Sequence, residues 1–280
     1  MDRPTDTAGI TLVCCGLIGT LVVDDGLIER SFAEAIATQG VVSGTSAFAR
    51  RMSQVHQARG LAPGDVLRVL FPDNEPRAQA AKLAFDRALP EALSRTVVQP
   101  IPGAVEALAE MRASGRQVCV LTSLPRRVVD LVLGAADLHG QVDLALSGED
   151  APRGFPAPDL ALTAVIQAGA GSVRDVAVVH GTGAGMECGR RSAASAMVGV
   201  LTGPHSATRL RGGGATHVVS SIADLPALLK GIDRDSVSEA GASDNGTTTT
   251  AARPARGAAA GAPAAPDVPA QVGDRRRLQH

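Results

Sequence analysis

The chain has 280 residues, a formal net charge of −1 and a hydrophobic fraction of 45%, enough for a sizeable core in one or two domains. The near-zero charge gives no basis for binding nucleic acid, and no apolar run is long enough to span a bilayer. The N-terminus is polar and lacks the apolar centre of a signal peptide, so we expect a cytoplasmic protein. The four cysteines show no Cys-x-x-Cys spacing, so we expect neither a zinc site nor a disulfide framework.

The first expected element is a buried strand. Residues 12–15 form an uninterrupted apolar run, which is typical of a strand covered on both faces of a parallel sheet. Gly16 and Gly19-Thr20 then break the run. A loop that leaves the carboxyl end of such a strand is where α/β proteins build their sites, so this loop is the first place to look for function.

The next part of the chain is expected to be helical. Residues 27–39 carry one apolar face, and residues 43–96 contain a short apolar helix at 65–71. An Ala-rich helix follows at 75–89, and Pro90 stands just beyond its expected end. No strand pattern interrupts these helices, so the sequence predicts a helical insertion between the first and second strands.

Strands and helices alternate through the remainder of the folded part. The expected strands are residues 118–121, 142–146, 176–179, 197–201 and 217–219. The expected helices are residues 103–113, 125–133, 158–168, 187–196 and 225–229. This alternation predicts an α/β fold with a doubly wound, mainly parallel sheet.

From about Asp233 the pattern ends. Residues 235–280 are mostly Ala, Gly, Pro, Thr and Ser, with almost no large apolar side chain to offset the entropy of ordering. We therefore predict a disordered Ala/Gly/Pro-rich tail over residues 233–280.

Several segments between residues 10 and 230 carry the motifs of a known superfamily. They read IGTLVVDDG, GDVLRVLF, VLTSLPR, RGFPAPDLALTAV, VAVVHGTGAG and GVLTGPHSATRLRGGGATHVVSSIADLPALL. Together they resemble the haloacid dehalogenase (HAD) superfamily, and in particular its phosphonatase-like branch. The resemblance implies a HAD-like Rossmannoid core over residues 1–23 and 98–232 and a helical cap domain over residues 24–97. Asp24 and Asp25 stand where the superfamily has acidic residues at the cap hinge.

The resemblance also implies a chemistry for which this chain lacks the side chains. In the superfamily an aspartate attacks phosphorus, a second acts as acid/base, a basic residue holds the phosphoryl group, and acidic residues hold Mg²⁺. These positions are occupied here by Gly16, Ile18, Phe155, Gly181 and Gly185. The hydroxyl position, Thr122, is retained, whereas Pro63 aligns with a cap lysine. We therefore expect a pseudoenzyme that needs neither Mg²⁺ nor another cofactor and that has no metal site.

Two interpretations of the altered pocket stay open. Either it has become apolar in order to bind a neutral small molecule, or it is vestigial and binds nothing. The expected ligand-binding residues are Gly16, Leu17, Ile18, Thr122, Ser123, Arg126, Phe155 and His180. Backbone N–H groups of Leu17 and Ile18, with Thr122, Arg126 and Arg127, are also expected to hold an anion weakly, unless Thr122 only caps the next helix.

The leading functional hypothesis is a catalytically degenerate protein that acts in binding, regulation or as an accessory protein. Its expected partners are a small molecule between core and cap, a second copy or another protein, without nucleic acid or membrane. The alternative is an enzyme with replaced chemistry, which uses His180 oriented by Glu187, or a Cys15 thiolate. Because Cys15 lies in an apolar strand, a structural role is favoured for it. An ordinary HAD phosphatase or phosphonate hydrolase is the third hypothesis.

Overall fold

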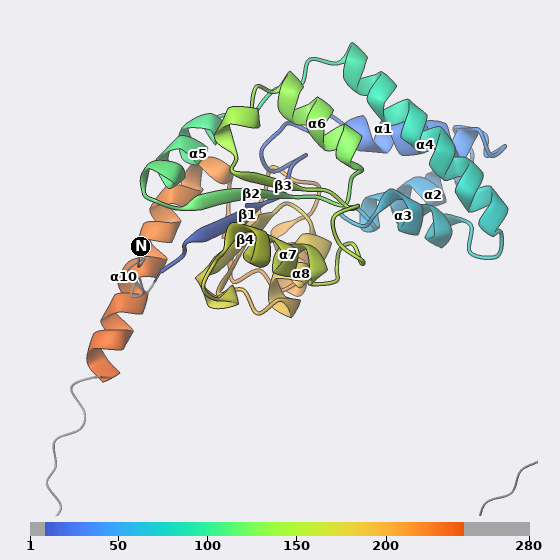
Figure 1. Cartoon of the computed structure of the whole chain (residues 1–280). Coiled ribbons are helices and arrows are strands. Elements are labelled where there is room, and N and C mark those ends of the chain that lie inside the picture. Colours follow the sequence, from blue (N-terminus) through green and yellow to red (C-terminus); the bar gives the residue numbers. More distant parts are fainter. Residues whose placement is uncertain (1–8, 244–280) are drawn as a thin grey trace, which may run out of the picture.

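The computed structural model describes residues 9–243 and is built around a six-stranded parallel sheet (Figure 1). The strands are β1 (Leu12–Cys15), β2 (Gln117–Leu121), β3 (Leu144–Leu146), β4 (Val176–His180), β5 (Ala196–Val200) and β6 (His217–Val219). Their spatial order is β3-β2-β1-β4-β5-β6, and Cys14 of the central strand pairs with Cys119 on one side and Val178 on the other. The α/β fold with a parallel sheet is therefore confirmed.

Helices precede, follow and connect these strands. They are α1 (Leu27–Ala37), α2 (Ser46–Gln57), α3 (Pro63–Leu70), α4 (Glu75–Arg95), α5 (Ala104–Ala113), α6 (Arg126–Ala135), α7 (Asp159–Ala168), α8 (Gly183–Arg191), α9 (Ala207–Gly212) and α10 (Leu225–Ser243). Three single turns of 3₁₀ helix lie at His139–Gln141, Val173–Asp175 and Ile222–Asp224.

The sheet is covered on both faces, as a doubly wound fold requires. Helices α5, α6 and α10 pack on one face, and α7, α8 and α9 on the other (Figure 1). Because side chains alternate along a strand, Val13 and Cys15 join the first core while Leu12 and Cys14 join the second. This two-sided burial explains the uninterrupted apolar run of the first strand.

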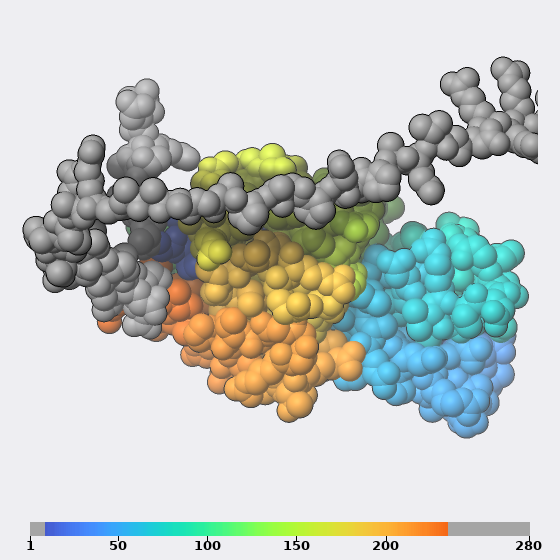
Figure 2. All heavy atoms as spheres, turned by 90° about the horizontal axis from the view of Figure 1, so that it is seen from below, coloured from blue at the N-terminus to red at the C-terminus, as the bar shows by residue number. Residues whose placement is uncertain are grey.

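The four helices α1–α4, here called the helical insert, stand between β1 and β2 in the chain and form a lobe beside the sheet (Figure 2). Their own contacts include Phe32 of α1 against Phe85 of α4, with ring centroids 4.3 Å apart. The carboxyl ends of the strands face this insert. The division into a core over 1–23 and 98–232 and a cap domain over 24–97 stays a prediction.

Helices α8 and α4 have bounds that differ from the sequence-based expectation. Helix α8 spans Gly183–Arg191 rather than 187–196, because the Thr182 hydroxyl accepts the Gly185 N–H and starts the helix early. Helix α4 continues through Pro90 to Arg95. Its buried face continues past the proline to Leu93, and this burial offsets the loss of the backbone hydrogen bond that proline cannot form.

The predicted start of the disordered tail at residue 233 is wrong. Helix α10 continues to Ser243, and no glycine or proline interrupts the chain between Ile232 and Ala240. The carboxylate of Asp233 accepts the Ile10 N–H at 3.0 Å and pairs with Arg116, so this residue is integrated into the fold. The remainder of the predicted tail, residues 244–280, lies outside the described residues.

Among residues 9–243, no helix combines the length and the apolar character needed to cross a bilayer. The cytoplasmic location stays a prediction.

Candidate functional site

The candidate site lies where the strand order reverses, between the carboxyl ends of β1 and β4. Chain connections leave these two neighbouring strands in opposite directions, which opens a crevice beyond their ends. Gly16 follows β1 directly, and His180 is the last residue of β4. The helical insert covers this crevice.

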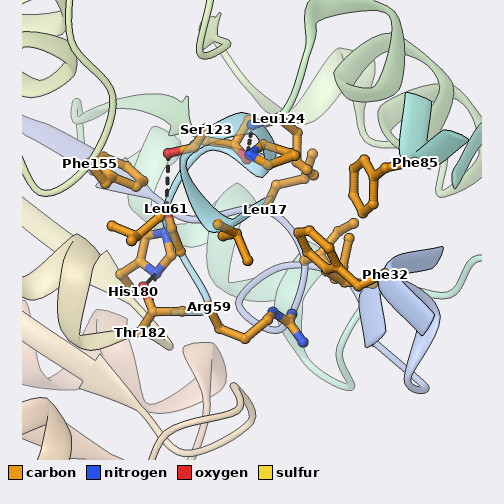
Figure 3. Close-up of a pocket in the computed structure, with 16 residues that line it drawn as sticks. Leu17, Phe32, Arg59, Leu61, Phe85, Ser123, Leu124, Phe155, His180 and Thr182 are labelled. Carbon is orange, nitrogen blue, oxygen red and sulfur yellow. Dashed lines mark hydrogen bonds between the residues drawn. The ribbon is translucent and has the colours of Figure 1, made fainter. Parts of the chain in front are cut away.

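A cavity of about 50 Å³ remains between the insert and the strand ends (Figure 3). Its walls are mostly apolar, and its polar groups come from Arg59, Thr122, Ser123, His180 and Thr182. Its lining residues are Leu17, Ile18, Ile28, Phe32, Arg59, Gly60, Leu61, Pro63, Val66, Phe85, Thr122, Ser123, Leu124, Phe155, His180 and Thr182. Ligand pockets usually measure several hundred Å³, so a ligand larger than a few atoms requires the insert to move.

The structure brings most of the predicted site residues together. Of the expected ligand-binding residues, those that line the cavity are Leu17, Ile18, Thr122, Ser123, Phe155 and His180. Gly16 lies beneath the His180 ring. Arg126 is not among the lining residues, because its guanidinium donates to the Ala145 carbonyl at 2.7 Å and pairs with Asp150. A cavity anion therefore has no arginine from the start of α6.

His180 is the buried polar residue at the centre of the site. Its side chain is enclosed by Phe155, whose ring meets it edge-on with centroids 5.2 Å apart, and by Thr182. The Thr182 backbone N–H donates to Nδ1 at 3.2 Å, which places the proton of the neutral ring on Nε2. Burial, with nearby His205 and Arg59, lowers the pKa of His180 to about 4. The ring is therefore uncharged at neutral pH.

The two hydroxyl residues after β2 serve the local structure. Thr122 Oγ1 accepts the Leu124 N–H at 3.2 Å, which stabilises the turn before α6. Ser123 Oγ donates to the carbonyl of Gly60 in the helical insert at 2.9 Å. The capping role considered for Thr122 is wrong, because Pro125 is the N-cap residue of α6 and no side chain caps that helix. Thr122 stabilises the preceding turn instead, and Ser123 adds a contact between the sheet and the insert.

The proposed acid/base partner and nucleophile are placed unfavourably for chemistry. Glu187 pairs with Arg190 and Arg191 on its own helix, and Thr182 rather than Glu187 holds the His180 ring. Cys15 is buried in the sheet, and this burial raises the pKa of its thiol far above the ordinary value.

Arg59 was missed by the sequence analysis. It is a buried residue of the insert that lines the cavity and extends toward Phe32 (Figure 3). Its guanidinium pairs with Asp24 at 2.5 Å and with Glu29, which gives Asp24 of the predicted hinge a structural partner. Asp25 is exposed, with a φ of 41°. One arginine among many gives no signal in sequence, because only tertiary packing shows that it is buried.

The last residues of α2 and the loop that follows are fastened to the sheet side by hydrogen bonds to their carbonyl groups. His205 Nε2 lies 3.1 Å from the His56 carbonyl, while its Nδ1 accepts the Gly183 N–H at 2.9 Å. Arg209 donates to the Gln57 carbonyl, and Ser123 to that of Gly60. His205 is nearly fully buried, and desolvation lowers its pKa to about 4. These contacts tie the insert to the sheet side next to the cavity.

Comparison with known proteins agrees with this architecture. The family model described as haloacid dehalogenase-like hydrolase matches residues 19–198. A structure of a phosphonoacetaldehyde hydrolase-like protein from Oleispira antarctica has a TM-score of 0.73 at 20% identity, covering 85% of this chain and 98% of that one. A hydrolase from Pseudomonas syringae has a TM-score of 0.69 at 23% identity, covering 79% and 99%. At such identities these two structures establish the fold alone.

Sequence relatives extend the comparison to a branch of the family. A phosphonoacetaldehyde hydrolase of Bordetella avium is 29% identical over 256 residues, covering 77% of this chain and 88% of that protein. The enzyme of the same name from Bordetella pertussis is 29% identical over 184 residues, covering 56% of this chain. The match spans 66% of the Bordetella pertussis protein, just under two thirds of its length. The chain belongs to the haloacid dehalogenase-like hydrolase family, in its phosphonatase-like branch.

Proposed function

We propose that this chain is a catalytically degenerate member of its family, without Mg²⁺-dependent phosphohydrolase activity. It acts as a binding, regulatory or accessory protein through the cavity beneath the helical insert. The observation that carries the proposal is that no carboxylate is present among the sixteen residues lining the cavity. The family attack on phosphorus needs a nucleophile, and Gly16 at the end of β1 has no side chain to supply one.

The residues of the site do not fit the Mg²⁺ that the family implies. Mg²⁺ takes hard oxygen ligands in octahedral geometry, usually with at least one carboxylate. Gly181 and Gly185 offer no side-chain oxygen, and the carboxylates of Asp24 and Glu29 are engaged by Arg59. Within the part of the chain that the structure describes, no three His, Cys, Asp or Glu residues gather in a group able to hold a metal.

An enzyme with replaced chemistry is less well supported by the geometry. A histidine that acts as general base through Nε2 needs an unprotonated Nε2 and therefore a proton on Nδ1. The Thr182 N–H points at Nδ1 and disfavours that form. The neutral ring thus offers the cavity an N–H donor rather than a base.

The character of the cavity favours an uncharged ligand over a phosphate. The lining is mostly apolar, His180 is neutral, and the charge of Arg59 is compensated by two carboxylates. A ligand of ordinary size enters only when the end of α2 and the loop after it separate from His205, Arg209 and Ser123. A second copy or a protein partner stays a prediction.

Hydrolysis tests the proposal directly. The full-length protein is incubated with phosphonoacetaldehyde and with p-nitrophenyl phosphate, each with Mg²⁺ or with EDTA. We expect phosphate release at the protein-free rate in every case. The proposal would be refuted, and an ordinary phosphohydrolase supported, by phosphate release that rises with Mg²⁺ and disappears with EDTA. To be assigned to this protein, that release must also follow it through size exclusion and change in a Phe155→Ala variant.

A further inference from the structure

The imidazole of His180 is seated on two glycines that come from different parts of the chain. A Cβ added to Gly16 would lie 2.8 Å from His180 Cδ2 and 2.9 Å from Nε2, closer than real Cβ contacts. A Cβ added to Gly185, in the first turn of α8, would lie 2.6 Å from Cδ2 and closer still to Cγ. The ring therefore fills the space that side chains at both positions would need.

Backbone conformation does not explain these glycines. Gly16 and Gly185 are not among the glycines with a positive φ, so a residue with a side chain can adopt either backbone geometry. Gly185 also lies within a helix, where alanine is intrinsically favoured by about 1 kcal/mol. At Gly185 the atoms that stand nearest to an added side chain all belong to His180, whereas at Gly16 the His180 ring shares this role with Thr20 Oγ1.

The neighbouring Gly181 has a different reason for being glycine. Its added Cβ would lie 2.6 Å from the Cα of Gly203 and 3.2 Å from the nitrogen of that residue. This contact is between two backbone segments and does not involve the imidazole. The three glycines at family catalytic positions therefore divide into two that accommodate His180 and one that accommodates the loop after β5.

We propose that Gly16, Gly185 and His180 form one packed unit, in which the imidazole fills the space between the ends of β1 and β4. In this position the ring presents a fixed N–H donor to the cavity. In the described part of the chain, Nδ1 is bonded by Thr182 and Nε2 has no hydrogen-bond partner. A ligand that enters the cavity meets this donor and presents to it an acceptor, such as an uncharged carbonyl oxygen. The ligand class rests on the proposed function, whereas the packed unit does not.

A double-mutant cycle tests the packing. Gly185→Ala should lower the thermal midpoint of the otherwise unchanged protein, because the new methyl group displaces the ring. In a His180→Gly background the three atoms nearest to the new methyl group are gone and the helix preference of alanine favours the substitution, so it should no longer lower the midpoint. Gly16→Ala should also lower the midpoint, and His180→Gly should remove only part of this loss, since the new Cβ also meets Thr20 Oγ1 at 2.8 Å.

Gly189→Ala is the matched control on the same helix. Its Cβ would meet Met197 and Val178, each at 2.9 Å, so its effect on the midpoint should be equal in both backgrounds. An equal loss from Gly185→Ala with and without His180 would overturn the packed unit.

Nuclear magnetic resonance on the unaltered protein keeps the proposal testable if the His180→Gly variants do not fold. Two-bond ¹H–¹⁵N correlations at pH 7 should show His180 with a protonated Nε2 and an unprotonated Nδ1. A proton on Nδ1 would overturn the donor assignment. Neither measurement depends on turnover, so failure here is distinct from failure of the proposed function.

Discussion

Acid should destabilise this protein through His180 before its carboxylates begin to titrate. The pKa of His180 is lowered from 6.5 to about 4 by burial and by the positive charge of its neighbours. Below pH 6.5 this histidine binds a proton in the unfolded chain but stays unprotonated in the native protein, so the free energy of unfolding falls as the pH drops toward 4. At pH 5 this difference corresponds to about 2 kcal/mol, or a midpoint lower by about 4–8 °C than at neutral pH for a domain of this size.

The assay compares thermal midpoints at pH 7.5 and pH 5 for three proteins. The wild type should show the full decrease, and His180→Gln should show a decrease that is smaller by about 4–8 °C. His139→Gln is the control, because His139 is exposed and its substitution should leave the decrease unchanged. His205, whose pKa is also about 4, adds to the decrease of the midpoint in acid in all three proteins. If His180→Gln loses as much stability in acid as the wild type, the buried neutral imidazole is not the cause.

Three further predictions concern the buried cysteines and the end of the chain. All four cysteines are buried, so we expect no thiol of the folded protein to react with Ellman's reagent at pH 8 and all four to react in denaturant; a rapidly reacting thiol would revive the replaced-chemistry hypothesis for Cys15. Asp233→Ala should lower the thermal midpoint by several degrees, because it leaves Arg116 without its carboxylate and the Ile10 N–H without its acceptor. Truncation after Ser243 should change the midpoint by less than about 2–4 °C, since the removed residues offer no apolar face. If truncation lowered the midpoint more than Asp233→Ala does, the folded part would not end with α10.

The sequence predicted the centre of the sheet well because β1, β4 and β5 are buried on both faces, whereas the edge strands β3 and β6 are largely half-buried. An apolar run such as 12–15 is hard to place elsewhere than in a parallel sheet, and the structure confirms it as β1. The errors came where a local stop signal competed with tertiary contacts. Pro90 lies inside α4 because the buried face of that helix continues to Leu93, and Asp233 is ordered because Arg116 and Ile10 hold its carboxylate.

The cavity was predictable only on the side of the sheet. Gly16, Phe155 and His180 lie at strand ends or in motifs, so their convergence follows from topology. Arg59 comes from the helical insert, whose position over the strand ends is set by long-range contacts such as Ser123 to Gly60. Nothing local in the sequence distinguishes this arginine from the exposed ones.

A glycine at a position where the family resemblance implies a catalytic residue has two physical interpretations, and sequence alone does not separate them. It is either an unused site, where any small residue is tolerated, or a position kept free for a neighbouring side chain. At Gly185 the second interpretation is favoured, because the helix prefers alanine and the His180 ring stands where its methyl group would go. An unused site would have no reason to retain the less stable residue. A carboxylate side chain at residue 16 or 185 would therefore have to displace the imidazole first, so the two glycines and His180 belong to one packing arrangement.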